Sequence, residues 1–520
     1  MTKIKSLNQW FVHVVLTLLV VTGYTQLAAL SSLASNDPYP MHSALNPQRY
    51  LYTREKLRMV GIPLDVEDKQ QVGLSFSAFG QTACIAKNQA NDSIPLGDLN
   101  GRWGMVGLLY GPLPEGKMLP PTLQTAFDNL FPTFEVGTLN DPLFIDPAQN
   151  VGFFSVPLLY KKKGIRIQFE ALLGRIGRGC VPYTDSSYHS DFGIQFNAGV
   201  ADICQHLSQT CQTEVIQNAD ETDTQCCRPK SKCGICDALI PGFHNRTCCM
   251  LDVGCSPCGG TCKIFVDDPP VTVANINKYL MCELKNIAPE ICLDISKFHE
   301  VSPEDIEIFL FWRHAYFINK GRIGWPAFLL MPYIEAGGSI GVGKSRDPNH
   351  AFALPFGNNG HHSFGGLAGI DFDFVNSVTF GGEVGATYFL SKKFCNYRVP
   401  NSRCQSGIYP FMTDVNIKPG FNWHFGLKMA AYHFYDRLSF YFQYLYIHHE
   451  EDEITLCKPD PAFVPEVLEN KSCWKSQMIN VGFAYDISPN ITFGFLWQTP
   501  TVQRNAYRPT TLMITFNAEF

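Results

Sequence analysis

Charged residues are scarce in this 520-residue sequence, and the motifs that carry familiar chemistry are missing. Only 17% of the residues are charged, and the 41 basic residues are intermingled with 47 acidic ones. The sequence therefore has no basic field that could bind a nucleic-acid backbone. A GxSxG elbow, a Walker loop, an HExxH zinc helix and a nucleotide fingerprint are all missing from usable contexts. We expect no enzymatic activity, no cofactor and no nucleic-acid partner.

Long apolar runs are also missing beyond the first residues. Lys3 and Lys5 precede an apolar run at residues 10–21, and small residues follow up to Ala34. This layout is typical of a secretory signal peptide, and the run is shorter than the roughly 20 residues of a spanning helix. We predict that residues 1–34 are a cleaved signal peptide, with an uncleaved anchor as the alternative. Because no later stretch approaches the ~18 apolar residues of a helical span, any membrane insertion must use strands.

Apolar and polar residues alternate with a period of two along much of the chain. Aromatic residues make up 13% of it, and there are 42 glycines, a composition typical of sheet-rich proteins with much apolar surface. Alternate positions lie on opposite faces of a strand, so each such segment predicts one apolar and one polar face. About 13 strands can be marked in this way, which predicts an all-β fold. The clearest segments are residues 72–78, 165–171, 192–200, 378–388, 423–431, 479–485, 491–497 and 511–520.

The lengths of the connections distinguish a membrane barrel from a soluble β-sandwich, which shows the same alternation. Transmembrane barrels join their strands by short turns at one end and by longer loops at the other. We therefore predict a transmembrane antiparallel up-and-down β-barrel with an even number of strands, about 14 within a range of about 12 to 16. Read backward from the C-terminus, the connections are 499–509 (long), 486–490 (short), 449–474 (long), 435–437 (short), 391–420 (long), 375–377 (short) and 344–363 (long).

The last strand carries a resemblance to a known family. One of its faces holds Leu512, Ile514, Phe516, Ala518 and the terminal Phe520. In this pattern the chain resembles the bacterial outer-membrane β-barrel proteins, a likeness that extends over the strands of the barrel. The resemblance implies a location in the outer membrane and contact with its lipid. It also implies an assembly signal at Phe516, Ala518 and Phe520 that the barrel-assembly machinery reads.

The polar face of each strand is predicted to line the lumen. A barrel of the predicted size has a lumen wide enough for water unless something fills it. The predicted function is therefore a porin-like channel for the passive diffusion of small hydrophilic solutes. The alternative is a plugged barrel that serves as a surface adhesin or as a disulfide-cross-linked structural protein of the envelope, and an outer-membrane hydrolase is the third hypothesis. The pore-lining candidates are Arg166, Gln168, Glu170, Gln195, Asn197, Glu383 and Lys428.

Cysteines are concentrated near the middle of the chain. Of the 19 cysteines, 13 lie between Cys204 and Cys292. We therefore divide the chain after the signal peptide into a first part of the β-barrel (35–200), a cysteine-rich inserted module (201–300) and a second part of the β-barrel (301–520). Strand parity leaves open whether the module is external, periplasmic or inside the lumen.

Two chemistries fit the cysteine spacing of the module, where the pattern CC-x5-C-x2-C begins at Cys226 and again at Cys248. Export places these thiols in an oxidising compartment, and a short loop-rich segment needs disulfides to fold, so we predict a disulfide-rich module. The alternative is a zinc ion, which would be held by Cys233, Cys236, Cys255 and Cys258, with His206 and His244 nearby. The disulfide candidates are Cys226, Cys227, Cys233, Cys236, Cys248, Cys249, Cys255, Cys258, Cys262, Cys395, Cys404, Cys457 and Cys473.

The cysteines outside the module allow local pairs. Cys395 with Cys404, and Cys457 with Cys473, each fall within one predicted loop and are predicted to pair. Cys84 and Cys180 have no obvious partner. The total is odd, so at least one cysteine stays free or pairs with another chain. A homo-oligomer linked by disulfides is one form of such pairing. The composition is also reminiscent of the cysteine-rich porins of chlamydia-like bacteria, a resemblance that implies disulfide-linked partners in the envelope.

Two local features allow more than one interpretation. Residues 302–305 (Ser-Pro-Glu-Asp) have the pattern of a helix start, but residues 306–317 fit a strand equally well. The histidine pairs at 361–362 and 448–449 are interpreted as solvated loop residues rather than as metal ligands at the rim. We therefore predict no metal site.

Overall fold

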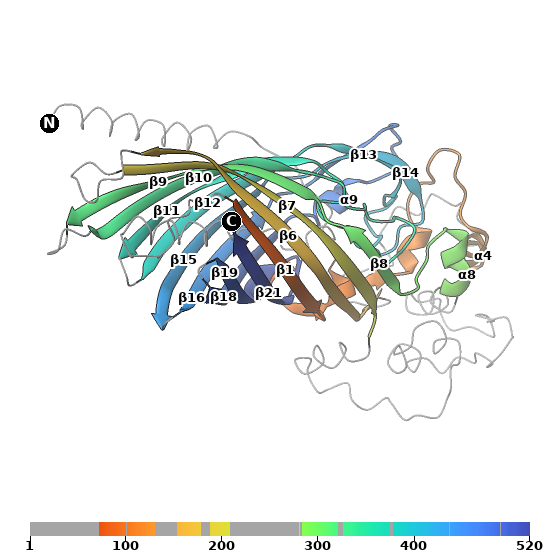
Figure 1. Ribbon diagram of the computed structural model, residues 1–520. Helices are drawn as coiled ribbons and strands as arrows, with labels where there is room; N and C mark the ends of the chain where they lie inside the picture. Colours follow the sequence, from red (N-terminus) through yellow and green to blue (C-terminus); the bar gives the residue numbers. More distant parts are fainter. Residues whose placement is uncertain are drawn as a thin grey trace, which may run out of the picture.

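The computed structural model shows a barrel of long tilted strands with a folded cap at one end (Figure 1). It describes residues 72–99, 101–130, 153–177, 188–208, 280, 283–320, 326–374, 378–435, 437–488 and 490–520. The predicted signal peptide and the module's cysteines other than Cys204 and Cys292 lie outside these residues. Among the described residues, no helix is long and apolar enough to cross a membrane.

Twelve long strands form the wall of the barrel. The main sheet has 13 strands, of which β8 pairs only with β7, and the other twelve form a closed ring of antiparallel pairs. The ring closes because β6 pairs with both β1 and β7. Its strands are β1 (Val72–Ala83), β6 (Leu158–Gly177), β7 (Tyr188–Leu207), β9 (Ile306–Lys320), β10 (Pro326–Ile340), β11 (Ser363–Phe374), β12 (Thr379–Phe389), β15 (Asn422–Tyr435), β16 (Leu438–His449), β18 (Trp474–Ser488), β19 (Ile491–Arg504) and β21 (Thr510–Glu519).

This closed ring confirms the predicted all-β antiparallel barrel and excludes the β-sandwich. The best single estimate of fourteen strands is wrong, and twelve is the lowest number in the predicted range. The reason is that β8 (Phe298–Pro303) pairs with the end of β7, from Val200 to Gln205, where β7 has run past its other neighbour β9. The chain between the wall strands also builds short sheets of its own instead of further wall strands.

The two faces of the wall differ as the alternation predicts. On β21, Leu512 and Ile514 are 51% and 50% exposed, whereas Thr511 and Met513 beside them are at most 1% exposed. Strand β1 alternates in the same way along most of its length. Large apolar side chains are exposed on the outward face of many wall strands. Such a continuous apolar outer surface suits contact with lipid.

The predicted alternation of long and short connections is confirmed. For example, β11 and β12 are joined by residues 375–378, whereas β12 and β15 are joined by residues 390–421. In the first part of the chain β1–β6 and β7–β9 are the long connections. Both ends of the segment 201–300 therefore leave the barrel at the end that carries the long loops. Strand β7 continues to Leu207 and β8 begins at Phe298, so the sheet includes residues at both ends of this segment.

The long loops fold together into the cap, which Figure 1 shows at one end of the barrel. It contains three small sheets and one large apolar core whose members include Trp103, Phe127, Phe352 and Val399. The cap elements are β2 (Ile85–Lys87), β3 (Ser93–Pro95), η2 (Leu96–Asp98), β4 (Trp103–Gly104), η3 (Val106–Leu109), α4 (Pro121–Leu130), β5 (Phe153–Phe154), α8 (Leu284–Glu290), β13 (Lys392–Arg398), β14 (Met412–Lys418), β17 (Glu453–Leu456), α9 (Glu466–Glu469) and β20 (Ala506–Tyr507).

Two loops of the cap cross so closely that one position requires glycine. Gly111 has a φ of +97°, and a Cβ atom there would lie 2.1 Å from the carbonyl oxygen of Asn401. The side chain of Asn401 donates hydrogen bonds to the carbonyl oxygens of Tyr110 and Pro112 on either side of this glycine. The loop after η3 and the loop after β13 are therefore locked together by backbone contact.

The predicted local disulfides are wrong. Cys395, Cys404, Cys457 and Cys473 are free thiols. In each predicted pair, one thiol is exposed to solvent while the other is half-buried, and Cys404 packs against the core of the cap. Sequence proximity therefore does not bring the paired sulfur atoms together. Cys84, which had no obvious partner, does take part in a disulfide.

The two open local interpretations are also decided. Residues 306–317 lie in strand β9, so the helix start at residues 302–305 is not found. The histidines are not all solvated loop residues, since His361 is 0% and His449 is 1% exposed. Burial lowers the pKa of His361 to about 4, and its Nδ1 lies 2.9 Å from the carbonyl oxygen of Leu390. Within the described part of the chain, no cluster of three potential metal ligands occurs.

Candidate functional site: the lumen network and the cap cavity

A chain of polar contacts crosses six neighbouring strands on the inner face of the barrel. It begins at Lys428 on β15, whose Nζ lies 2.7 Å from Asp371 Oδ1 on β11. The same ammonium donates a hydrogen bond of 2.8 Å to the hydroxyl of Tyr333 on β10. That hydroxyl in turn donates to Glu383 Oε2 on β12, also at 2.8 Å. One cation therefore connects to two carboxylates, directly and through a tyrosine.

The network continues on the other side of Glu383. Gln443 on β16 donates from Nε2 to Glu383 Oε1 at 2.8 Å, and Asn480 on β18 donates to Gln443 Oε1 at 3.0 Å. Gln443 and Asn480 are both 0% exposed, and Glu383 is 3% exposed. These side chains are therefore packed against other protein atoms and do not face a wide aqueous channel. In this structure the lumen is filled at the level of the network.

A second group of charges lies on β6, β7, β9 and the turn between β8 and β9. Arg166 donates two hydrogen bonds to the carboxylate of Glu304, at 2.6 and 2.8 Å, and Lys162 lies 2.9 Å from the same carboxylate. Paired oxygens facing a guanidinium in this way form the strongest class of ion pair. Arg313 lies 3.6 Å from Glu170 and 3.8 Å from an oxygen of Asp191, so these two carboxylates share one cation.

All seven pore-lining candidates alternate with outward apolar residues and lie on the inner face. Glu170, Gln195, Glu383 and Lys428 are buried, and the remaining three, Arg166, Gln168 and Asn197, are half-buried. Arg166, Glu170, Glu383 and Lys428 belong to the two groups described above. Gln195 donates to Asn197, which donates to Glu307. Gln168 lies on β6 between Arg166 and Glu170 and shares their side of the strand.

Other members of the network were not identified from sequence. Gln443 is the single amide within a strongly aromatic strand, and that isolation is a usable signal for an inward position. Lys162 is the middle residue of three consecutive lysines, and alternation alone predicts that it faces inward while its neighbours face outward. Asp371 alternates with Phe372 and Phe374 and has the same signal, whereas Tyr333 has none.

The lumen becomes apolar toward the cap. Phe79, Tyr160, Leu496 and Met513 are buried on wall strands, and they belong to the same core cluster as the residues of the cap. The cap is therefore anchored directly on the upper inner wall of the barrel. Any solute path through this end would have to displace apolar packing as well as polar contacts.

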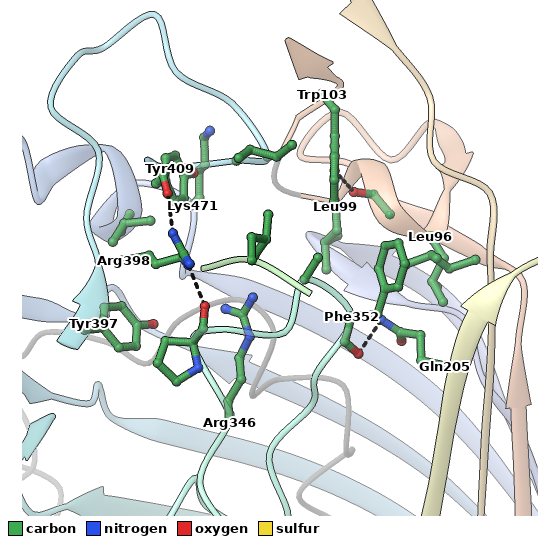
Figure 2. A pocket seen from close by; sticks show the side chains of 18 of the residues that line it. Leu96, Leu99, Trp103, Gln205, Arg346, Phe352, Tyr397, Arg398, Tyr409 and Lys471 are labelled. Atoms are coloured by element: carbon green, nitrogen blue, oxygen red, sulfur yellow. Dashed lines mark hydrogen bonds between the residues drawn. The ribbon is translucent and has the colours of Figure 1, made fainter. Parts of the chain in front are cut away.

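The cap encloses a cavity, shown in Figure 2, with a volume of about 80 Å³. That is several times the volume of about 10 to 15 Å³ that one water molecule needs. Its walls come from segments spread over most of the chain, including η2, the loop after β10, β13 and the turn after α9. The lining side chains include three cations, Arg346, Arg398 and Lys471, and no Asp or Glu.

The residues of the predicted assembly signal lie at the seam of the barrel. Phe516 is 42% and Phe520 is 68% exposed, and Phe516 is paired with Phe76 of β1. The backbone of Phe520 exchanges two hydrogen bonds with Val72, at 2.9 and 3.3 Å. The signal residues thus lie on β21, the strand that closes the ring, or directly after it. Their recognition by the assembly machinery stays a prediction.

Comparisons with known proteins give structural neighbours alone. No protein-family model matches the chain, and no curated protein matches it in sequence. The fold is similar to an outer-membrane channel from Pseudomonas putida F1, with 8% identity, a TM-score of 0.40, and coverage of 88% of this chain and 100% of that one. It is also similar to the transport unit of the autotransporter AIDA-I from Escherichia coli (6% identity, TM-score 0.32, 91% and 97% covered). A third similar structure is the toluene transporter TbuX from Ralstonia pickettii (8% identity, TM-score 0.25, 87% and 90% covered).

Proposed function

We propose that the chain spans the bacterial outer membrane and forms a channel for small hydrophilic solutes that is closed in its resting state. The observation that carries the proposal is the buried network around Lys428 and Glu383 inside an apolar outer wall. A barrel that only anchors a cap has no need of buried charges, since apolar packing of the same volume is often at least as stable. Paired charges on long side chains can exchange partners and admit water, which apolar packing cannot.

The location is supported by three features of the chain. Exposed apolar side chains cover the outward face of the wall strands, as contact with membrane lipid requires. The ring of twelve antiparallel strands is even in number and needs no unpaired edge, which is how a sheet avoids unsatisfied backbone groups in lipid. The third feature is the pair of predicted signals, the signal peptide and the assembly signal at Phe516, Ala518 and Phe520. On this proposal the partners are outer-membrane lipid and the barrel-assembly machinery.

Single-channel recording in planar bilayers tests the channel. The full chain would be refolded in detergent, and its insertion would be verified by protease protection of the barrel. The wild type is expected to give ohmic current steps with a low open probability. Asp371→Asn removes the charge that lies 2.7 Å from the Lys428 ammonium, and it is expected to raise the open probability. Glu453→Gln removes an exposed carboxylate of the cap in the same way and is expected to leave the currents unchanged.

The same recordings decide between the channel and its rival. Verified insertion of the wild type and of Asp371→Asn without any current would overturn the channel. Equal effects of Asp371→Asn and Glu453→Gln would overturn the role of the network. Recordings with reductant add a second readout, because the disulfide at Cys84 lies directly after β1.

The second candidate function is a plugged barrel that holds the cap as a surface or envelope module. It is favoured by the large apolar core of the cap, which continues into the upper lumen at Phe79 and Leu496. The exposed thiols of Cys395 and Cys457 give the cap a means of cross-linking to envelope partners or to a second copy of the chain. Non-reducing electrophoresis of intact cells tests the cross-link. A monomer that is identical with and without reductant would remove this form of the hypothesis.

A further inference from the structure

The cavity of the cap has an unbalanced charge. Arg346, Arg398 and Lys471 line it, and no acidic residue does. Burying cations away from water is unfavourable unless acceptors or counter-charges compensate them. The acceptors that the protein supplies to each cation therefore show where a ligand is required.

Arg398 is held almost entirely by backbone carbonyl groups. Its Nε donates to Pro348 at 2.6 Å, and Nη1 donates to Tyr409 at 3.0 Å. Nη2 donates to Ile291 at 2.6 Å and to Cys292 at 3.0 Å. Burial lowers the pKa of Arg398 to about 10, so the guanidinium stays protonated at neutral pH. Four of its five N–H groups are used by neutral acceptors, so Arg398 contributes positive potential more than free donors.

Arg346 is held differently, by one atom. Its Nε donates to the carbonyl oxygen of Ala353 at 3.1 Å, and its backbone N–H donates to Asn359 Oδ1 at 2.8 Å. Among the described residues, the terminal nitrogens Nη1 and Nη2 have no hydrogen-bond partner. Figure 2 shows the side chain of Arg346 at the cavity. A guanidinium that is fixed through Nε and open at both terminal nitrogens has the geometry for two parallel hydrogen bonds to one carboxylate.

Two further polar groups of the lining lack partners in the described part of the chain. The hydroxyl of Tyr409 is buried without a hydrogen-bond partner. Burial raises the pKa of this hydroxyl, and the nearby Arg346 charge opposes the rise. The Lys471 ammonium is largely buried without an ion pair, and burial lowers its pKa to about 8. A buried donor without an acceptor is unfavourable, and a ligand oxygen that accepts its hydrogen bond removes that penalty.

The remainder of the cavity is apolar, which restricts the kind of anion. Apart from the cations and Tyr409, its walls are formed largely by hydrophobic residues, among them Leu99, Trp103, Phe352 and Ile408. A fully hydrated inorganic anion has no apolar surface that could pack against these walls. An anion with a hydrocarbon portion satisfies both parts.

We propose that the cap cavity is a binding site for a small organic carboxylate, with the carboxylate on the terminal nitrogens of Arg346 and the hydrocarbon part against Trp103 and Phe352. Lys471 and the Tyr409 hydroxyl supply further donors from the cavity wall. The cavity volume of about 80 Å³ restricts the ligand to a short aliphatic or single-ring acid. The site lies in the cap, so the proposal holds whether or not the barrel conducts.

Isothermal titration calorimetry of the full chain in detergent tests the site. Benzoate and hexanoate are the probes, benzamide is the neutral control of the same shape, and inorganic phosphate tests for a plain anion site. Arg346→Gln removes the proposed contact. Arg346→Lys keeps the positive charge but lacks the two terminal nitrogens that make parallel hydrogen bonds. The matched control is Arg403→Gln, because Arg403 is an exposed arginine of the cap that does not line the cavity.

Wild-type protein is expected to bind benzoate at least tenfold more tightly than benzamide. Arg346→Gln is expected to weaken benzoate binding at least tenfold and Arg346→Lys less, whereas Arg403→Gln changes it less than twofold. Equal affinity for benzoate and benzamide, tighter binding of phosphate than of either acid, or no binding at millimolar concentration would each overturn the proposal. Near-UV circular dichroism checks the fold of each variant. If Arg346→Gln fails to fold, the comparison of benzoate, hexanoate, benzamide and phosphate on the wild type still decides.

Discussion

Replacing Lys428 by methionine is the most direct perturbation of the lumen. Its ammonium lies 2.7 Å from Asp371 and 2.8 Å from the Tyr333 hydroxyl, and its side chain is 7% exposed. Methionine is similar in length, so the change removes the charge with little loss of volume. Asp371 and, through Tyr333, Glu383 then lose their shared cation.

The size of the effect follows from burial. Removing one partner of a buried ion pair is unfavourable by about 3 to 5 kcal/mol, because it leaves an uncompensated charge. With a urea slope of about 3 kcal/mol per molar, the unfolding midpoint is expected to fall by about 1 M or slightly more. The assay is urea unfolding of the protein in lipid vesicles, followed by tryptophan fluorescence.

An exposed ion pair of similar length provides the control for Lys428→Met. Lys418 lies 2.9 Å from Glu453 on the cap, with side chains 31% and 48% exposed. Exposed pairs contribute about 0 to 1 kcal/mol, so Lys418→Met is expected to shift the midpoint far less. The double variant Lys428→Met with Asp371→Asn is expected to recover part of the loss, because it removes the orphaned charge as well. Equal shifts for Lys428→Met and Lys418→Met would refute the argument that the lumen network is buried and paired.

Three further predictions concern the cap. Gly111→Ala places a Cβ atom 2.1 Å from a backbone oxygen, so limited proteolysis should cleave the cap of this variant faster than the cap of Gly116→Ala. At Gly116 the φ angle is also positive, but no atom lies within 4 Å of a Cβ. Equal cleavage of the two variants would contradict the loop crossing. Cys395 and Cys457 are exposed, so a maleimide should label both thiols in the folded, unreduced protein. If mass spectrometry finds neither cysteine modified, they are not free thiols. Because burial lowers the pKa of Lys471 to about 8, its charge is present below that pH and lost above it. Benzoate affinity should therefore fall as the pH rises from 7 to 9, and it should change less with pH in Lys471→Arg. Equal pH dependence of the affinity in the two proteins, measured by calorimetry, would contradict a role for Lys471 in binding.

The direction of the barrel side chains could be predicted from sequence, but their contacts could not. Alternation is a local property, so the inward positions of Glu383 and Lys428 follow from their immediate neighbours. Which residues they meet depends on the stagger between strands, and no local pattern contains it. Lys428 is directly opposite Gly381 on β12, and its ion pair reaches one strand farther, to Asp371 on β11.

The cap was beyond sequence reasoning for a related reason. Arg346, Arg398 and Lys471 lie in three different long loops, and none of them has a local pattern that distinguishes it from a surface residue. The incorrect pairs among the loop cysteines have the same origin. Cys395 and Cys404 are close in sequence, but one is exposed and the other packs on the core. Two residues that are close in sequence within one loop need not be in contact when the loops of several hairpins fold into a common core.

The closure of the ring between β1 and β21 determines the order of events during folding. The side chains of Gln81 and Thr511 form a hydrogen bond across 430 residues of chain. Until residues 510–519 are in place, β1 and β19 each keep an unpaired edge, and such edges readily join other chains. Contacts so distant in sequence also form slowly. A chain in which residues 510–519 have not yet paired would therefore be an open sheet with two edges prone to aggregation. The protein most needs an assembly factor in the interval before this closure.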